Sequence, residues 1–212
     1  MNRAELKANA KAQIKGKIGV LFLITLIIGL ISGAASAVLN LIPGGSLVAS
    51  IIITPAFTLS IYRVYVNLFK GAAPQVKDAF CGFDDFWAAF KDTFLVGLFT
   101  FLWSLLWVIP GIIKAISYTM SFYILAENKG KPALECINES KTMTEGHKME
   151  LFVLGLSFIG WALLCGFTFG IAFIWVGPYM QATMTNAYFS LKKAPEAQAA
   201  VEAPVVDAEA AE

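Results

Sequence analysis

The sequence predicts an all-α fold, a polytopic membrane helix bundle with six transmembrane helices in three hairpins and amphipathic cytoplasmic interfacial helices. Apolar residues make up 58% of the 212 residues and charged residues only 15%, whereas a soluble domain has about 45–50% and about 25%. Long apolar stretches match the roughly 20 residues that cross a bilayer. These stretches do not alternate in polarity as barrel strands do, so helices are favoured. The composition excludes a disordered chain, a coiled coil and a broad basic nucleic-acid-binding face.

The first predicted hairpin consists of residues 18–41 and 47–69. The first of these spans carries no charge, and Arg63 is the only charge in the second. Residues 42–46 read Ile-Pro-Gly-Gly-Ser, a turn-forming sequence that separates the two spans.

The two remaining apolar stretches are each too long for a single crossing. Residues 93–125 as one helix would measure about 50 Å at 1.5 Å per residue, so we expect a turn at Ile109-Pro110-Gly111. Residues 149–191 meet the same objection, and we expect their turn near Cys165 to Gly170. The predicted spans are therefore residues 93–109, 111–127, 149–166 and 170–191. Together with the first hairpin they form a single integral membrane domain, residues 1–193.

Three segments outside the spans predict helices at the membrane surface: residues 3–17, 74–92 and 132–145. The second carries a predicted lipid-facing aromatic side at helical spacing, made of Phe80, Phe83, Trp87, Phe90 and Phe94. This side either lies in the interface or packs on the protein's own spans, and the two interpretations are compatible. The lysines of residues 3–17 either contact anionic lipid or only set the topology. Residues 194–212 carry five acids and no base, and predict a disordered cytoplasmic tail.

Lysine and arginine set the predicted orientation. Six paired spans leave 15 of the 16 basic residues on one side, with Lys114 alone near the other. The positive-inside rule then places both termini in the cytoplasm. A cleaved signal peptide ending at Ala35-Ser36-Ala37 is the weaker alternative, because the apolar run is too long for one.

A unit of cytoplasmic helix, span, outer turn and span recurs three times in this prediction. Its sequence echo is faint: Pro55, Tyr65 and Lys70 match Pro178, Tyr188 and Lys193 at a constant offset of 123.

Four polar residues at or near the spans are candidates for structural or transport roles. We hypothesise that Arg63 and Glu127 form an ion pair that ties two hairpins. Lys114 either extends to the outer headgroups or lines a cavity. Gln181 is expected to join helices by hydrogen bonds.

The sequence carries no pattern of an enzyme. Cys81, Cys136 and Cys165 form no disulfide or metal-binding pattern, and His147 is the only histidine. Phosphate-binding, hydrolase-nucleophile, zinc-protease and dinucleotide signatures are absent. We expect no catalytic residue, cofactor or metal.

The second half of the chain resembles a known family. It contains Ser117-Tyr118, residues 123–128 (Tyr-Ile-Leu-Ala-Glu-Asn), residues 139–143 (Glu-Ser-Lys-Thr-Met) and Gly177-Pro178-Tyr179. These motifs resemble a family of uncharacterised bacterial integral membrane proteins, domain of unknown function 975. The resemblance implies about six membrane helices, a bacterial cytoplasmic membrane and no assigned catalytic residues.

Two functional interpretations remain from the sequence. The first is a non-enzymatic membrane scaffold or interaction protein. Its expected partners are the lipid bilayer and either a membrane protein or a second copy of the chain, and no nucleic acid is expected to bind. The alternative is a small-molecule or ion transporter or channel with a path between the hairpins, which the proline-bearing spans around Pro55 and Pro178 support.

Overall fold

The computed structural model describes residues 2–41, 45–106, 108–168 and 170–202, and every regular element in these ranges is a helix. The all-α prediction is therefore confirmed for this part of the chain. The elements are α1 (Arg3–Ile14), α2 (Ile18–Leu39), α3 (Gly45–Phe69), the 3-10 helix η1 (Val76–Asp85), α4 (Phe86–Leu106), α5 (Val108–Tyr118), α6 (Ser121–Glu127), α7 (Ala133–Thr144), α8 (Lys148–Leu156), α9 (Ile159–Phe167) and α10 (Phe173–Glu202).

Three segments of the described chain are long and apolar enough to cross a membrane, which indicates membrane association. They are residues 18–39, 76–105 and 148–167. The prediction of six spans is not supported, because the described chain contains three such segments and each of the two longest apolar stretches is divided among three helices. Residues 93–125 are shared among α4, α5 and α6, and residues 149–191 among α8, α9 and α10.

The predicted turns have different outcomes. The turn near residues 165–170 is confirmed, since α9 ends at Phe167, Gly170 has φ 86° and α10 begins at Phe173. The turn expected at Pro110 is misplaced: α5 already begins at Val108. Pro110 lies in its first turn, where a missing N–H breaks no helical hydrogen bond. Within the expected turn at 42–46, residues 42–44 lie outside the described residues.

The predicted interfacial helix 74–92 is replaced by η1 followed directly by α4. A 3-10 helix is more tightly wound than an α-helix and seldom runs far. Here ten residues keep this form, and hydrogen bonds from α3 hold them, as described below. The predicted helices 3–17 and 132–145 correspond to α1 and α7.

Ser140 on α7 explains why the fourth predicted span is interrupted between α5 and α6. Its hydroxyl donates to the carbonyl oxygen of Ser117 at 2.7 Å and accepts from the N–H of Met120 at 3.2 Å. The two backbone groups left open by the break are therefore both satisfied inside the protein, as burial requires.

The first and last thirds of the chain repeat one structure. Both α1 and α7 have 12 residues, and each is followed by a turn with a left-handed glycine, Gly16 (φ 78°) or Gly146 (φ 79°). The next residues, Lys17 and His147, have φ −113° and −112°. Buried residues also correspond at an offset of 130: Leu6, Ala10, Ile14, Leu21, Ile24 and Ile28 match Cys136, Ser140, Thr144, Leu151, Leu154 and Phe158.

The helices α3 and α10 correspond as well, at the offset of 123 seen in the sequence. Their matched buried pairs are Leu59 and Ala182, Ser60 and Thr183, Arg63 and Asn186, Tyr65 and Tyr188, and Leu68 and Leu191. Ser60 and Thr183 both donate to the carbonyl oxygen four residues earlier, at 3.0 and 2.7 Å. The faint sequence echo therefore coincides with one burial pattern on two helices.

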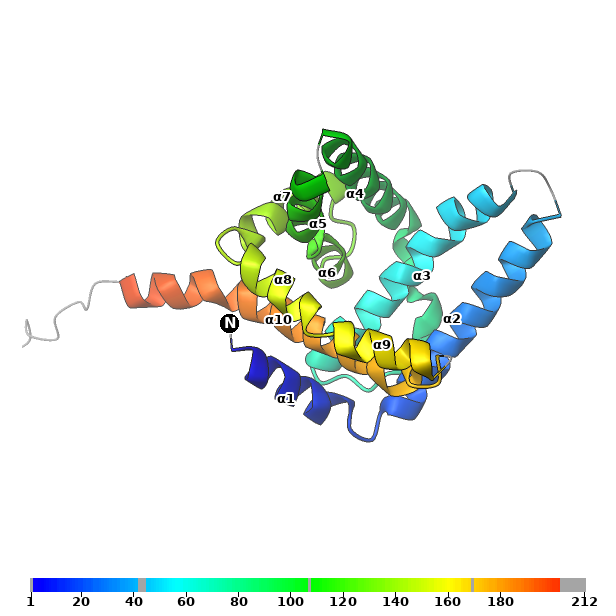
Figure 1. The fold of residues 1–212 in the computed structure, drawn as a ribbon, viewed down its shortest axis with the longest axis horizontal. Coiled ribbons are helices and arrows are strands. Elements are labelled where there is room, and N and C mark those ends of the chain that lie inside the picture. Colours follow the sequence, from blue (N-terminus) through cyan, green and yellow to red (C-terminus); the bar gives the residue numbers. More distant parts are fainter. Residues whose placement is uncertain (1, 42–44, 107, 169, 203–212) are drawn as a thin grey trace, which may run out of the picture.

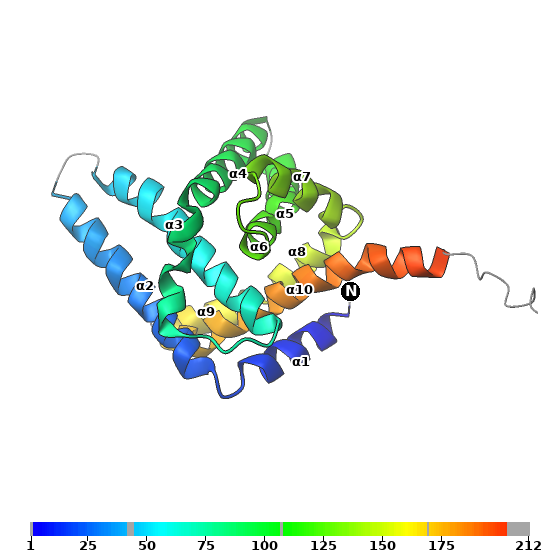
Figure 2. The ribbon, with the colours of Figure 1, turned by 180° about the vertical axis from the view of Figure 1, so that it is seen from behind.

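Hydrogen bonds link the repeated units into a closed ring. Each unit's second helix bonds to the short helix that opens the next unit. Helix α3 bonds to η1 through Ser60 and Arg63, and the α5–α6 junction bonds to α7 through Ser140. Helix α10 returns to α1, where Asn186 Nδ2 donates to the carbonyl oxygen of Leu6 at 3.3 Å. Figures 1 and 2 show α10 running beside α1, with the α2–α3 hairpin on one side and α4–α7 on the other.

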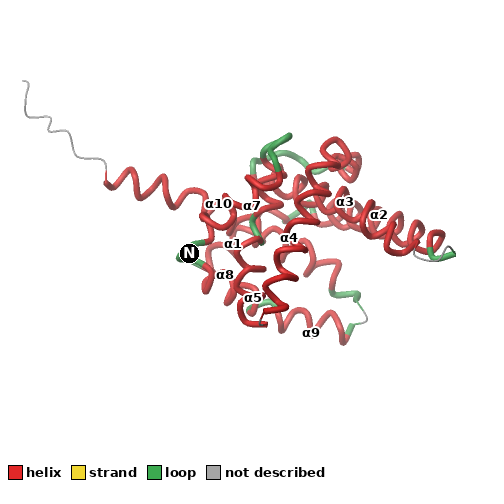
Figure 3. Tube along the Cα trace, turned by 90° about the horizontal axis from the view of Figure 1, so that it is seen from above, coloured by secondary structure: helices red, strands yellow, loops and turns green. Residues whose placement is uncertain are grey.

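Helix α10 is longer than the sequence indicated. It continues to Glu202, and its last turns extend away from the other helices (Figure 3). The sequence predicts disorder from residue 194, but alanine, which is frequent in this segment, is the strongest helix former. Residues 203–212 of the predicted tail lie outside the described residues.

The buried face of α7 gives a prediction about thiol reactivity. Cys136 on this face is fully buried, and burial, together with the charge of Asp92, raises the pKa of its thiol to about 12. Because the thiolate is the reactive form, we expect maleimide to leave Cys136 unlabelled at pH 8 in the folded protein. The matched control is a Cys136→Ser chain carrying Glu135→Cys, since the neighbouring Glu135 is exposed. Equal labelling of the two positions would contradict the burial of this face.

Candidate functional site

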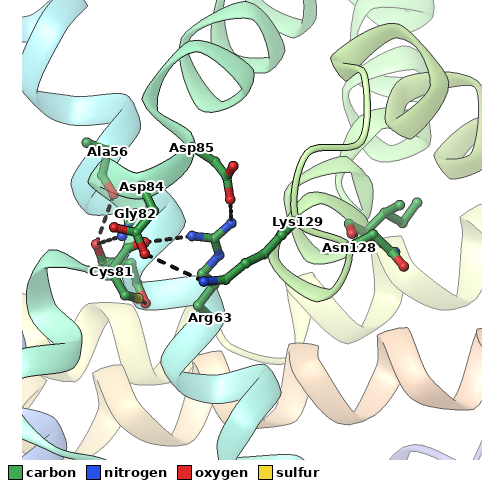
Figure 4. A network of polar contacts seen from close by, with 10 residues as sticks. Ala56, Arg63, Cys81, Gly82, Asp84, Asp85, Asn128 and Lys129 are labelled. Atoms are coloured by element: carbon green, nitrogen blue, oxygen red, sulfur yellow. Dashed lines mark hydrogen bonds and ion pairs between the residues drawn. The ribbon is translucent and has the colours of Figure 1, made fainter.

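The most extensive polar junction joins α3 to η1 (Figure 4). Arg63 is buried, with 3% of its surface exposed, and its guanidinium pairs with Asp85. Arg63 Nη1 also donates to the carbonyl oxygen of Cys81 at 2.6 Å. The Arg63 side chain therefore holds both the backbone of η1, at Cys81, and the last residue of η1, Asp85, which directly precedes α4.

A second contact in this junction depends on a glycine. The N–H of Gly82 donates to Ser60 Oγ at 2.8 Å, and Ser60 Oγ donates to the carbonyl oxygen of Ala56 at 3.0 Å. A Cβ atom on Gly82 would lie 2.0 Å from that carbonyl oxygen. The backbones of η1 and α3 therefore approach so closely that no side chain fits between them. At the edge of the junction, exposed Lys129 and Asp84 lie 3.5 Å apart.

The predicted ion pair between Arg63 and Glu127 is wrong. The carboxylate of Glu127 instead lies 3.0 Å from Lys70 Nζ and 2.8 Å from Lys192 Nζ, and it accepts from the Tyr188 hydroxyl at 2.5 Å. The sequence placed Glu127 at the correct end of its helix, but it could not show that η1 carries a closer carboxylate for Arg63. Glu127, at the end of α6, therefore ties the residue after α3 to the middle of α10.

A polar stripe runs along α10 from Glu127 toward the interior. Gln181, Thr185, Tyr188 and Lys192 are spaced by four, three and four residues, so they share one face of the helix. Gln181 Nε2 donates to the hydroxyl of Tyr123 on α6 at 3.3 Å. The helix-joining role expected of Gln181 is therefore present, and the same residue lines a cavity that is discussed below.

Lys114 contacts an aromatic ring of its own hairpin. Its Nζ lies 4.6 Å from the centre of the Trp103 ring, within cation–π range. Lys114 does not line the cavity between α2, α3 and α10 that is described below. The lysines of α1 make similar contacts, with Lys7 5.0 Å from the ring centre of Phe158 and Lys11 5.7 Å from that of Tyr179.

The predicted aromatic side packs in part on α3 and is in part exposed. Phe80 and Phe83 pack against Phe57 of α3, with ring centres 6.1 and 5.2 Å apart, yet each remains about 45% exposed. Trp87 is 69% exposed and Phe94 58% exposed, with the half-buried Phe90 between them. We call Phe80, Phe83, Trp87, Phe90 and Phe94 the aromatic face.

The sequence missed one buried carboxylate. Asp92 has the spacing of a residue on the polar side of an amphipathic helix, but it is fully buried. Its Oδ1 accepts a hydrogen bond from Ser121, and its Oδ2 has no partner among the described residues. The sequence signal that could have located Asp92 is the small residue Ala89, one turn earlier on the same side of α4. Ala89 is also fully buried and allows close packing on this side.

Metal-binding geometry is not found within the described residues: no three His, Cys, Asp or Glu side chains gather there as ligands. His147 Nδ1 lies 3.0 Å from Glu150.

The described chain thus has the fold of an α-helical, membrane-associated protein, whose polar groups join helices to one another. Its sequence assigns it more closely. The model of the family described as "Protein of unknown function (DUF975)" matches residues 1–119 and 105–195, and the chain belongs to this family. No curated protein and no solved structure matches it.

Proposed function

We propose that this protein is a non-enzymatic scaffold of the bacterial cytoplasmic membrane, a multi-pass protein with both termini in the cytoplasm. In this role the aromatic face contacts the bilayer and a membrane-protein partner or a second copy of the chain. The observation that carries the proposal is that large aromatic side chains remain exposed on a segment that is otherwise firmly held. Exposed contiguous apolar patches mark membrane or protein contact sites.

The firm attachment supports a docking role. Flexible aromatic segments lose conformational entropy when they bind, whereas a preorganised face avoids most of that cost. The pair of buried Arg63 with the partly buried Asp85, together with the close contact at Gly82, holds η1 against α3 before any partner arrives. The aromatic face is therefore presented in one geometry.

Site-specific photocross-linking in native membranes tests this proposal. We expect a photoreactive amino acid at Trp87 or Phe94 to cross-link to lipid and to one discrete protein, which is either a partner or a second copy. The matched control is Lys129, whose side chain is 67% exposed but lies among charged residues, and which should give neither product. Cross-links to lipid alone from both aromatic positions would remove the scaffold role and leave only membrane anchoring.

The polar stripe on α10 favours transport as a second candidate. It connects the lining of a partly open cavity, at Gln181, with the charged cluster around Glu127. A saturable flux in proteoliposomes that the Gln181→Leu substitution abolishes would favour transport over the scaffold.

A further inference from the structure

A cavity of about 150 Å³ lies between α2, α3 and α10. Its wall is mainly apolar, with Phe22, Ile61, Phe173 and Pro178 among the lining residues. An apolar protein cavity of about this volume is known to stay dry and to accommodate a benzene molecule. The cavity therefore has room for one ring-sized apolar group.

One accessible hydroxyl in the cavity wall has no hydrogen-bond partner among the described residues. Tyr65 lines the cavity and is 4% exposed, and no described residue hydrogen-bonds to its hydroxyl. The tyrosines at comparable positions on the other inner helices are both engaged: Tyr188 donates to Glu127 at 2.5 Å, and Tyr123 accepts from Gln181 at 3.3 Å. The Tyr65 hydroxyl is therefore free to donate a hydrogen bond to a group that enters the cavity.

The second polar group of the wall complements the first. Gln181 donates an amide N–H to Tyr123, and its side chain also contacts Tyr62, while its amide oxygen can act as an acceptor. The third polar lining residue, Thr25, already donates its hydroxyl to the carbonyl oxygen of Leu21 at 3.0 Å. The wall thus offers one donor, from Tyr65, and one acceptor, from Gln181.

The lining contains no charged side chain among the described residues. A charged ligand would lose its hydration there without gaining a counter-charge, at high cost. A hydroxyl group accepts from one neighbour and donates to another, which matches Tyr65 and Gln181 together.

We propose that this cavity is a binding site for a small uncharged amphiphile, a ring-sized apolar molecule with one hydroxyl group, of the phenol or benzyl alcohol class. The ring fills the apolar part of the cavity. The hydroxyl accepts from Tyr65 and donates to Gln181. This site is separate from the aromatic face and does not depend on the scaffold role.

Fluorine NMR with 4-fluorophenol as the probe tests the site in the full chain in detergent micelles. We expect saturable binding to the wild type and about tenfold weaker binding to Tyr65→Phe, the loss expected for one hydrogen bond. The matched control is Tyr118→Phe, because Tyr118 is equally buried at 4% exposure but does not line the cavity. Fluorobenzene, which lacks the hydroxyl, should bind Tyr65→Phe and the wild type with the same affinity.

A cavity-filling variant separates binding from partition into the micelle. Thr25→Phe should abolish the saturable signal, and its thermal unfolding reports whether it folds. Uptake that stays linear in the wild type, or that is equal in Tyr65→Phe and Tyr118→Phe, would overturn the proposal. Native mass spectrometry provides a further test. The proposal would also be overturned by a co-purified lipid that Thr25→Phe excludes from the protein but that 4-fluorophenol does not displace.

Discussion

Replacing Gly82 with alanine is expected to cost about 3 kcal/mol or more of unfolding free energy. The added Cβ would lie 2.0 Å from the carbonyl oxygen of Ala56 and 2.7 Å from the backbone nitrogen of Ser60. Overpacking usually costs about 1–3 kcal/mol, but these neighbours are backbone atoms of α3 that no side-chain rotation can move. Titration of the detergent-solubilised protein with a denaturing detergent measures the loss.

Gly97 is the matched control for this substitution. It lies on α4, and a Cβ atom added there would have no neighbouring atom within 4 Å, so Gly97→Ala should be neutral or stabilising by up to about 1 kcal/mol. Gly82→Ala should also increase proteolysis within η1, because the segment can no longer sit on α3. If both alanine variants unfold at the same denaturant concentration, the close approach of η1 and α3 does not exist.

Removing the positive charge of Arg63 is expected to have an effect of similar size. Arg63→Met leaves Asp85 without its partner and the carbonyl oxygen of Cys81 without its donor. Breaking one side of a buried ion pair costs about 3–5 kcal/mol. Asp85→Asn in the Arg63→Met background should restore part of this stability, since the unpaired carboxylate is then gone.

Two comparisons make this result specific to the Arg63–Asp85 pair. Glu127→Gln in the Arg63→Met background should give additive losses, because the two residues have different partners. Lys129→Ala removes an exposed pair with Asp84 and should have no measurable effect. If Glu127→Gln, and not Asp85→Asn, recovered the stability lost in Arg63→Met, the result would support the Arg63–Glu127 ion pair that the sequence suggested.

The helical fold was predictable because apolar composition and the length of apolar runs are properties of single segments. The helices α1 and α7 followed from charge, proline and glycine signals at their ends. The break at Met120 did not, because Ser140 stabilises it from a segment twenty residues away. A local pattern contains no information about such a partner.

The polar junctions show the same limit. Arg63 and Gln181 were recognisable as costly polar groups in apolar surroundings. Their partners were not, because Asp85 and Tyr123 come from other elements and the 3-10 winding of η1 rotates its side chains away from the α-helical register. Asp92 and Tyr65 were missed for the same reason: each is ordinary in sequence and unusual only in its packing.

The contact between α10 and α1 has a consequence for the order in which the protein can be made. Helix α1 is synthesised before its hydrogen-bonded neighbour Asn186, which lies 180 residues after Leu6 in the sequence. Helix α1 therefore lacks this native partner until α10 has been translated.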